Sequence, residues 1–293
     1  MGDGTGLSIP SRHPFAVHEM ALATLGLGTM FALLLAGNSS NFVLLEVATA
    51  AGLYVAVVFA CRDKTNTFQP RIRFLASFAF VLWFYCVVAH VTPALGTKLR
   101  DGNLLAIDEA MFGQTPAIFC ERIVTARLTD LMSLCYLTYH LYLFVVVLHA
   151  ALVPNTASQQ LSDYLFTGFA IGFAGYLLVP AIGPAFAYPE LFKEPLVGGA
   201  ITRLVAKVVA TGSSGYDVFP SLHVMITCIL LDHDWRNVRR RFWLMAVPLL
   251  GLLASTIYLR FHYGVDLLAA LLLFLALRRT FLKAGSREVG LPQ

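Results

Sequence analysis

Residues 215–266 read GYDVFPSLHVMITCILLDHDWRNVRRRFWLMAVPLLGLLASTIYLRFHYGVD, and the chain places its reactive side chains in this stretch. Two apolar blocks, Pro220 to Leu231 and Phe242 to Leu259, are separated by a connector with four arginines. Positive residues gather at the cytoplasmic ends of membrane helices. The stretch therefore predicts a helical hairpin in a membrane, whose outer ends bring the polar motifs around His223 and His262 to the same face.

The whole chain has the composition of an integral membrane protein. Its residues are 58% hydrophobic and 13% charged, with a mean hydropathy of +0.72, far from the mix that keeps a globular domain soluble. The apolar residues form long blocks, which is typical of helices in a lipid bilayer and differs from the alternation of a barrel. The net charge of +4 comes mainly from residues at block ends, so it indicates orientation and no nucleic-acid partner. The five cysteines lie apart without a CxxC pair, which predicts neither a disulfide framework nor a zinc site.

Eight blocks serve as candidates for a membrane-crossing helix, which needs about 20 apolar residues. They are Phe15 to Gly37, Phe42 to Cys61, Phe74 to Leu95, Leu128 to Val153, Tyr164 to Ile182, Pro220 to Leu231, Phe242 to Leu259, and Val265 to Leu277. We expect an all-α membrane protein with a six-helix core and two additional N-terminal helices. The expected division is 1–72 for a tail and the additional helices, 73–280 for the catalytic core, and 281–293 for a cytoplasmic tail.

The basic residues predict the orientation. Connectors on one side hold Arg62, Lys64, Arg71, Arg73, Arg236, Arg239, Arg240, Arg241, Arg278, Arg279, Lys283 and Arg287. Those on the other side hold fewer, spread over two long loops: Lys98, Arg100, Arg122, Arg127, Lys193, Arg203 and Lys207. The positive-inside rule then places both termini in the cytoplasm and the motifs outside, on the periplasmic side if the membrane is a bacterial inner membrane. The first long loop predicts an interfacial helix and turn from Asp108 to Gly113, and the second, 183–218, is placed to cover the site.

The residues at the outer face suit phosphoryl transfer. His262 and Asp266 are four apart, so in a helical turn they project to one side. The carboxylate can then accept the proton of one imidazole nitrogen and leave the other as a nucleophile or base. His223 comes from another helix as a candidate general acid, and Arg260 supplies a planar charge suited to phosphate.

The start of the sixth span adds a second phosphate-binding feature. Pro220 fits the first position of a helix, where its missing amide proton would have had no acceptor. The amides that follow, from Ser221 on, point outward and form an anion site.

Plainer interpretations apply to other polar residues. His140 and His149 on the fourth span are expected to be packing residues. Glu46 is expected to pair with a polar group in the bundle, whereas Asp130 caps or anchors its helix or serves the site. Two histidines and a carboxylate can also bind zinc or iron, but an arginine two residues from His262 disfavours a cation, so we expect no metal or cofactor.

Pro220-Ser221-Leu222-His223 and His262-Tyr263-Gly264-Val265-Asp266 resemble the Pro-Ser-x-His and His-x-x-x-Asp motifs of the type 2 phosphatidic acid phosphatase superfamily. The resemblance spans about Phe74 to Leu277. It implies that His262 attacks phosphorus to form a phosphohistidine without a metal, that Asp266 orients His262, and that His223 protonates the leaving oxygen.

The departures from the family pattern concern its cations. The Lys-x6-Arg-Pro motif is absent before Pro220, and Lys64 and Arg71 have its spacing only on the cytoplasmic side. Thr256 stands where the family has arginine, so Arg260 is expected to substitute. Leu222 in place of glycine is more similar to the branch of inositol phosphorylceramide synthases and sphingomyelin synthases.

We therefore expect a lipid phosphotransferase that moves a phosphoryl or phospho-alcohol head group between membrane lipids. The first alternative is a phosphatase acting on phosphatidic acid or a polyprenyl pyrophosphate. The second is a lipid transporter or scaffold that kept an inactive pocket.

Overall fold

The computed structural model describes residues 15–37, 41–62 and 68–288. Every regular element within these ranges is a helix, which confirms the all-α class. The predicted tail residues 1–14 and 289–293, and Lys64, lie outside the described residues.

Eight long helices correspond to the eight predicted blocks. They are α1 (Val17–Ala36), α2 (Asn41–Ala60), α3 (Phe68–Ala94), α6 (Ala126–Leu152), α7 (Thr156–Leu178), α10 (Leu222–Asn237), α11 (Arg239–Tyr258) and α12 (Gly264–Glu288). Within the described ranges, six of them are long and apolar enough to cross a membrane: α1, α2, α3, α6, α7 and α11. Helix α10 has 16 residues and α12 carries arginines in its second half, so eight crossings remain a prediction.

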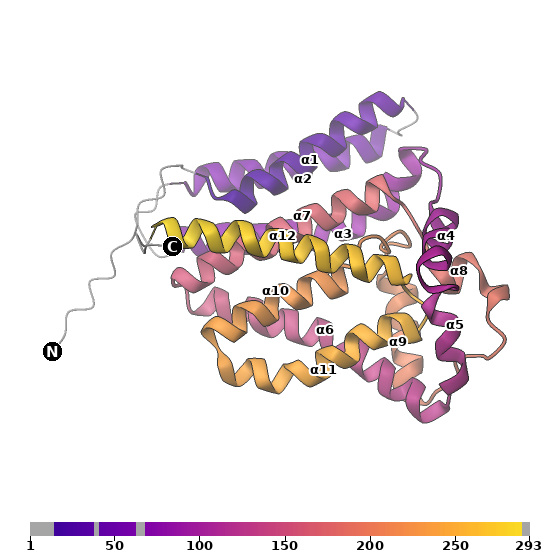
Figure 1. Cartoon of the computed structure of the whole chain (residues 1–293). Helices are drawn as coiled ribbons and strands as arrows, with labels where there is room; N and C mark the ends of the chain where they lie inside the picture. Colours follow the sequence, from indigo (N-terminus) through magenta and orange to yellow (C-terminus); the bar gives the residue numbers. More distant parts are fainter. Residues whose placement is uncertain (1–14, 38–40, 63–67, 289–293) are drawn as a thin grey trace.

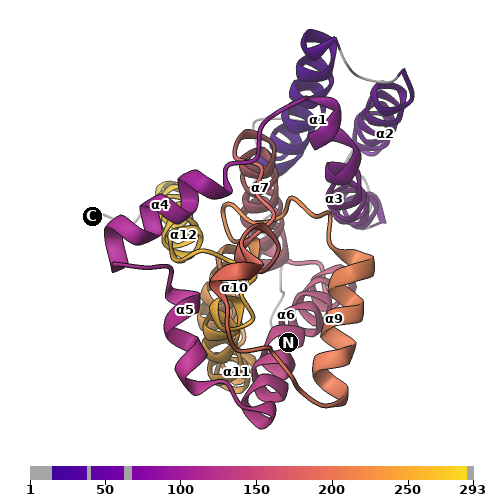
Figure 2. The ribbon, with the colours of Figure 1, turned by 90° about the vertical axis from the view of Figure 1, so that its right-hand side faces the viewer.

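The long helices run side by side, and the short ones gather at one end (Figure 1). The start of α1 and the end of α12 lie at the opposite end. The short elements are α4 (Asp101–Phe112), α5 (Pro116–Cys120), η1 (Glu121–Ile123), α8 (Pro184–Ala187), η2 (Pro189–Leu191) and α9 (Ala200–Gly212). Figure 2 looks onto this end and shows α4 and α5 along one side of it and α9 along the other. Both long loops therefore lie at the same end of the bundle, where the second was expected to cover the site.

Helices α1 and α2 stand to one side of the other long helices (Figure 2). Helix α1 packs against α7, and its buried Glu19 forms an ion pair with Arg73 of α3. Nδ1 of His18 lies 2.8 Å from a carboxylate oxygen of Asp163 on α7. Because an uncompensated charge is costly inside a bilayer, these pairs fasten α1 to α3 and α7.

A buried carboxylate joins α10 and α11 at the end opposite the short helices. Asp234 accepts hydrogen bonds from Nε and Nη2 of Arg241 at 2.6 and 2.5 Å. It also accepts one from the hydroxyl of Tyr142 on α6 at 2.6 Å. This inner clamp, formed by Asp234, Arg241 and Tyr142, holds the hairpin predicted from the arginine-rich connector.

Helix α4 confirms the expected helix and turn, although it begins at Asp101 rather than Asp108, and it ends at Gly113 with a positive φ of 82°. Helix α9 was not predicted, because the surrounding Gly and Pro residues gave that loop an irregular pattern. Asp130 caps α9 rather than its own helix: one carboxylate oxygen accepts hydrogen bonds from the amides of Gly199 and Thr202 at 2.8 and 3.0 Å. Glu46 has the polar partner that was expected, since Oε2 lies 3.3 Å from Nδ1 of His90, but the histidine is exposed rather than inside the bundle.

Candidate active site

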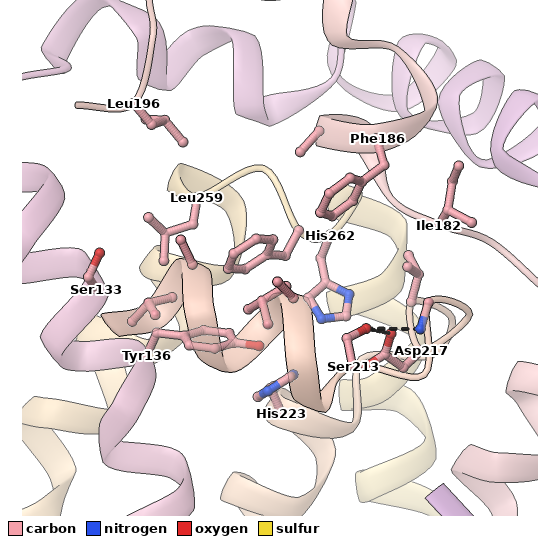
Figure 3. A pocket seen from close by; sticks show the side chains of 18 of the residues that line it. Ser133, Tyr136, Ile182, Phe186, Leu196, Ser213, Asp217, His223, Leu259 and His262 are labelled. Carbon is pink, nitrogen blue, oxygen red and sulfur yellow. Dashed lines mark hydrogen bonds between the residues drawn. The ribbon is translucent and has the colours of Figure 1, made fainter. Parts of the chain in front are cut away.

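A cavity of about 640 Å³ opens at the end of the bundle where the short helices lie. Helix α9 contributes one wall through Val205 and Val209, and the segment from Ile182 to Phe186 contributes another. Most of the lining is apolar, and His223 and His262 are the histidines that face it (Figure 3). The size and apolar lining are typical of a small-molecule site and suit a lipid head group with part of its chains.

The predicted pair of His262 and Asp266 is brought together. Nδ1 of His262 lies 3.3 Å from Oδ2 of Asp266. The same oxygen accepts the Tyr263 amide at 2.7 Å, and Asp266 has no exposed surface. A carboxylate at Nδ1 favours the tautomer with the proton on that nitrogen, which leaves Nε2 of His262 as the free nucleophile.

Ser221 lies on the other side of the imidazole. Its Oγ is 3.3 Å from Nε2 of His262, and its amide donates to the carbonyl of Asp266 at 3.3 Å. Ser221 is the N-cap of α10, so the expectation that Pro220 is the first helical residue was wrong by two positions. The backbone is extended at Ser221, with ψ of 101°, and helical geometry therefore starts only at Leu222.

Helix α7 packs directly against Pro220, the residue before Ser221. A Cβ at Gly175 would lie 2.3 Å from Cδ of Pro220, so only glycine allows the two backbones to approach this closely. The serine is thereby fixed between α7 and the start of α12, which supplies the carbonyl that its amide binds.

His223 stands beside His262, with 5.7 Å between the ring centroids. It lies between the rings of Tyr136 and Tyr139 of α6, at 4.8 and 4.7 Å. Its Nδ1 is buried and has no hydrogen-bond partner among the described residues. The aromatic neighbours orient the ring, and a ligand in the cavity would reach both histidines. His140 packs against Tyr139 as expected, but its ring also borders His223 at 6.2 Å.

Arg260 is not brought to this cavity. Its Nη2 donates to the carbonyl of Glu194 at 2.6 Å and lies 3.4 Å from Oε1 of Glu121. The guanidinium also lies over the Phe192 ring, 4.3 Å from its centroid. Burial lowers the pKa of Arg260 from its ordinary value, and Glu121 opposes that change. Arg260 lines a neighbouring pocket of about 240 Å³, which shares Ala185 and Leu196 with the main cavity, and its contacts join the two long loops. A phosphate-binding role for Arg260 therefore stays a prediction without a supporting contact.

The lining of the main cavity contains no lysine or arginine among the described residues. Asp217 is its carboxylate: one oxygen accepts the Ser213 hydroxyl at 2.7 Å, and the other accepts the hydroxyl of Tyr85. Figure 3 shows Ser213 and Asp217 among the residues that line the cavity with His262. Asp217 was not among the predicted site residues, although its position four residues before Ser221 was a usable signal. The nearest loop cations by sequence have exposed side chains: Arg122, Arg127, Arg203 and Lys207.

Within the described part of the chain, no three His, Cys, Asp or Glu side chains are grouped as metal ligands would be. His223, His262 and Asp266 instead form a row in which Asp266 contacts His262 and the ring of His262 faces that of His223. The row can orient one imidazole as a nucleophile and present a second as an acid.

Comparison with known families agrees with this geometry. A family described as the PAP2 superfamily matches residues 102–278, which is more than half of the chain. The match begins in α4 and ends in α12, so it includes both histidine motifs, whereas α3, expected to belong to the matching region, precedes it. No curated protein and no solved structure gives a significant match.

Proposed function

The chain belongs to the PAP2 superfamily, and we propose that it is an integral membrane lipid phosphotransferase with His262 as its nucleophile. The observation that carries the proposal is the run of contacts from Ser221 through His262 to Asp266 at the wall of an apolar cavity. The superfamily supports a lipid phosphatase or phosphotransferase, and the contacts support the assignment of roles.

The proposed reaction has two halves. Nε2 of His262 attacks the phosphorus of a lipid phosphoester while Asp266 holds the proton on Nδ1. The bond from phosphorus to the leaving oxygen breaks, and His223 gives that oxygen a proton. The acceptor hydroxyl then attacks the phosphohistidine, His223 takes the hydroxyl proton, and His262 is released.

Ser221 is proposed to bind the phosphoryl group. Its hydroxyl lies next to Nε2, where an attacked phosphorus would place its oxygens. The amide of Ser221 already donates to the carbonyl of Asp266, so Ser221 offers only its hydroxyl, and the N-terminus of α10 adds the positive end of a helix beside it. Together they would stabilise the charge that develops on the phosphoryl oxygens.

The charges in the cavity favour a diester as donor. A phosphodiester carries one negative charge, whereas a phosphomonoester approaches two near neutral pH. A lining that has Asp217 and no described lysine or arginine suits the smaller charge. We therefore favour transfer of a phospho-alcohol head group, as in the branch of inositol phosphorylceramide and sphingomyelin synthases, with the site on the extracytoplasmic face.

Hydrolysis is the second candidate, because superfamily membership supports it equally. Both activities share the first half-reaction and differ in whether water or a lipid alcohol enters second. Purified protein incubated with phosphatidate, a polyprenyl pyrophosphate or a phosphodiester lipid, each with and without a lipid alcohol, separates them. A head-group lipid that forms only with the alcohol supports transfer. Hydrolysis products alone, which are free phosphate from phosphatidate and the pyrophosphate and a phospho-alcohol from the diester, contradict it.

The nucleophile is tested in the same assay. His262→Ala is expected to abolish turnover and the acid-labile phosphoenzyme, while the matched control His149→Ala retains both. His149 is a suitable control because it lies in the last turn of α6, far along that helix from Tyr136 at the cavity. Turnover by His262→Ala at the wild-type rate would contradict the proposal. Full activity in EDTA is expected, and its loss would favour the metal interpretation.

A further inference from the structure

Helix α4 holds the start of α12 through a buried carboxylate. Asp108 has no exposed surface, and its carboxylate accepts three hydrogen bonds. Two come from the amides of Gly264 and Val265, both at 2.9 Å, and the third comes from the Thr115 hydroxyl at 2.8 Å. The first amides of a helix have no acceptor within it, and a negative charge is favourable there. Asp108 therefore caps α12 from a distant part of the chain.

The fit between the two segments is close. A Cβ at Gly264 would lie 2.7 Å from Cε2 of Phe112 and 2.8 Å from Cγ of Pro116. Those distances are shorter than side chains tolerate, so the corner between α4 and α5 packs directly on the backbone of α12. The start of α12 cannot move toward this corner, and the hydrogen bonds to Asp108 resist movement away from it.

The same turn carries the proposed nucleophile. The amide of Tyr263 donates to Asp266, and the next two amides along the chain donate to Asp108. Three successive amides are thus divided between the carboxylate that orients His262 and a carboxylate that does not face the cavity. A shift of the first turn of α12 would move Asp266 relative to both His262 and Ser221.

A second carboxylate of α4, that of Asp101, holds Tyr263, which lies between His262 and Gly264 in the chain. Asp101 accepts the Tyr263 hydroxyl at 2.9 Å and the amide of Gly183 at 2.9 Å. Because burial and the neighbouring Asp101 carboxylate both raise the pKa of Tyr263, this phenol keeps its proton and remains a donor. Helix α4 thereby joins the turn of His262 to the loop that lines the cavity.

We propose that Asp108 is a positioning residue for the phosphoryl transfer, acting through the first turn of α12 rather than on the substrate. This rests on the proposed function of His262. Displacement of a reacting group by about 1 Å can cost about 100-fold in rate. The role is therefore expected to appear in kcat more than in KM.

The test compares Asp108→Ala and Asp108→Asn with Asp234→Asn, as full-length proteins in detergent. Asp234 is a matched control, because it is an equally buried carboxylate with three hydrogen bonds, but it lies in the inner clamp. We expect kcat per folded molecule to fall about 100-fold in Asp108→Ala and less in Asp108→Asn, which keeps one acceptor oxygen. KM should change less than about threefold, and Asp234→Asn should keep its kcat.

Amide hydrogen exchange gives a second readout that does not depend on activity. Exchange should rise in the peptide that covers 262–268 of the Asp108 variants and stay unchanged in the same peptide of Asp234→Asn. Wild-type kcat in Asp108→Ala, an equal loss in the control, or unchanged exchange at 262–268 would overturn the proposal. If Asp108→Ala does not fold, Asp108→Asn decides alone. Turnover retained by His262→Ala would instead refute the proposed function. The exchange result would still test whether Asp108 caps α12.

Discussion

Oγ of Ser221 lies 3.3 Å from Nε2 of His262, although 41 residues separate them in the chain. The hairpin of α10 and α11 brings them together, because its two outer ends return to the same face. The contact places a hydroxyl donor beside the one imidazole nitrogen that Asp266 does not engage. It therefore marks where a phosphoryl group would be held while His262 attacks it.

Asp266→Asn is expected to lower kcat by about 1,000-fold or more while the protein stays folded. The amide can place its NH₂ group toward Nδ1, which favours the wrong tautomer of His262, and loss of such a carboxylate costs about 10⁴-fold in serine proteases. Single-turnover measurement of phosphoenzyme formation checks this, with elution volume as the control for folding. A rate within tenfold of wild type would mean that Asp266 does not orient the nucleophile.

Arg260→Gln is expected to lower stability and leave the chemistry intact. The side chain loses a charged hydrogen bond to the carbonyl of Glu194 and its ion pair with Glu121, which together contribute about 2 kcal/mol. The melting temperature should fall, whereas kcat and KM should stay within about threefold. A rise of KM by tenfold or more without a change in melting temperature would show instead that Arg260 binds the phosphate.

Ala206→Trp is expected to block the cavity against long lipids. Ala206 lies on α9 and lines the cavity, so an indole there takes up space that the substrate needs. KM for a long-chain donor should rise at least tenfold, and turnover of a short-chain, water-soluble donor should change little. The control is Leu204→Trp on the same helix, because Leu204 is half exposed and does not line the cavity. Equal effects of both substitutions would show that α9 matters only for stability.

The contact between His262 and Asp266 could be predicted because the two residues are close in the sequence. His262 and Asp266 are four residues apart, so one turn of helix decides their relation, and the prediction needed no knowledge of the packing. The eight apolar blocks were readable for a similar reason, since the bilayer requires a minimum length of apolar helix. Individual ends differed by several residues: α7 begins at Thr156 rather than Tyr164, because the Asn155 side chain caps its polar first turns.

The roles of Arg260 and Asp108 could not be predicted in the same way. Arg260 has a left-handed backbone, with φ of 64°, which turns its side chain away from the cavity that His262 faces. Sequence spacing assumes regular geometry and cannot anticipate such a residue. Asp108 acts across 156 residues, and only the packing of α4 on α12 shows which amide it binds. Long-range caps of this kind have no local pattern.

The carboxylate of Asp217 has a consequence for inhibition by inorganic phosphate. A cavity with a negative side chain and no lysine or arginine among its described lining residues attracts a free phosphate dianion poorly. Inorganic phosphate would therefore neither accumulate beside His262 nor compete well with an incoming lipid. A bilayer enzyme built in this way would keep working in a phosphate-rich compartment, where a site crowded with arginines would be occupied by the anion.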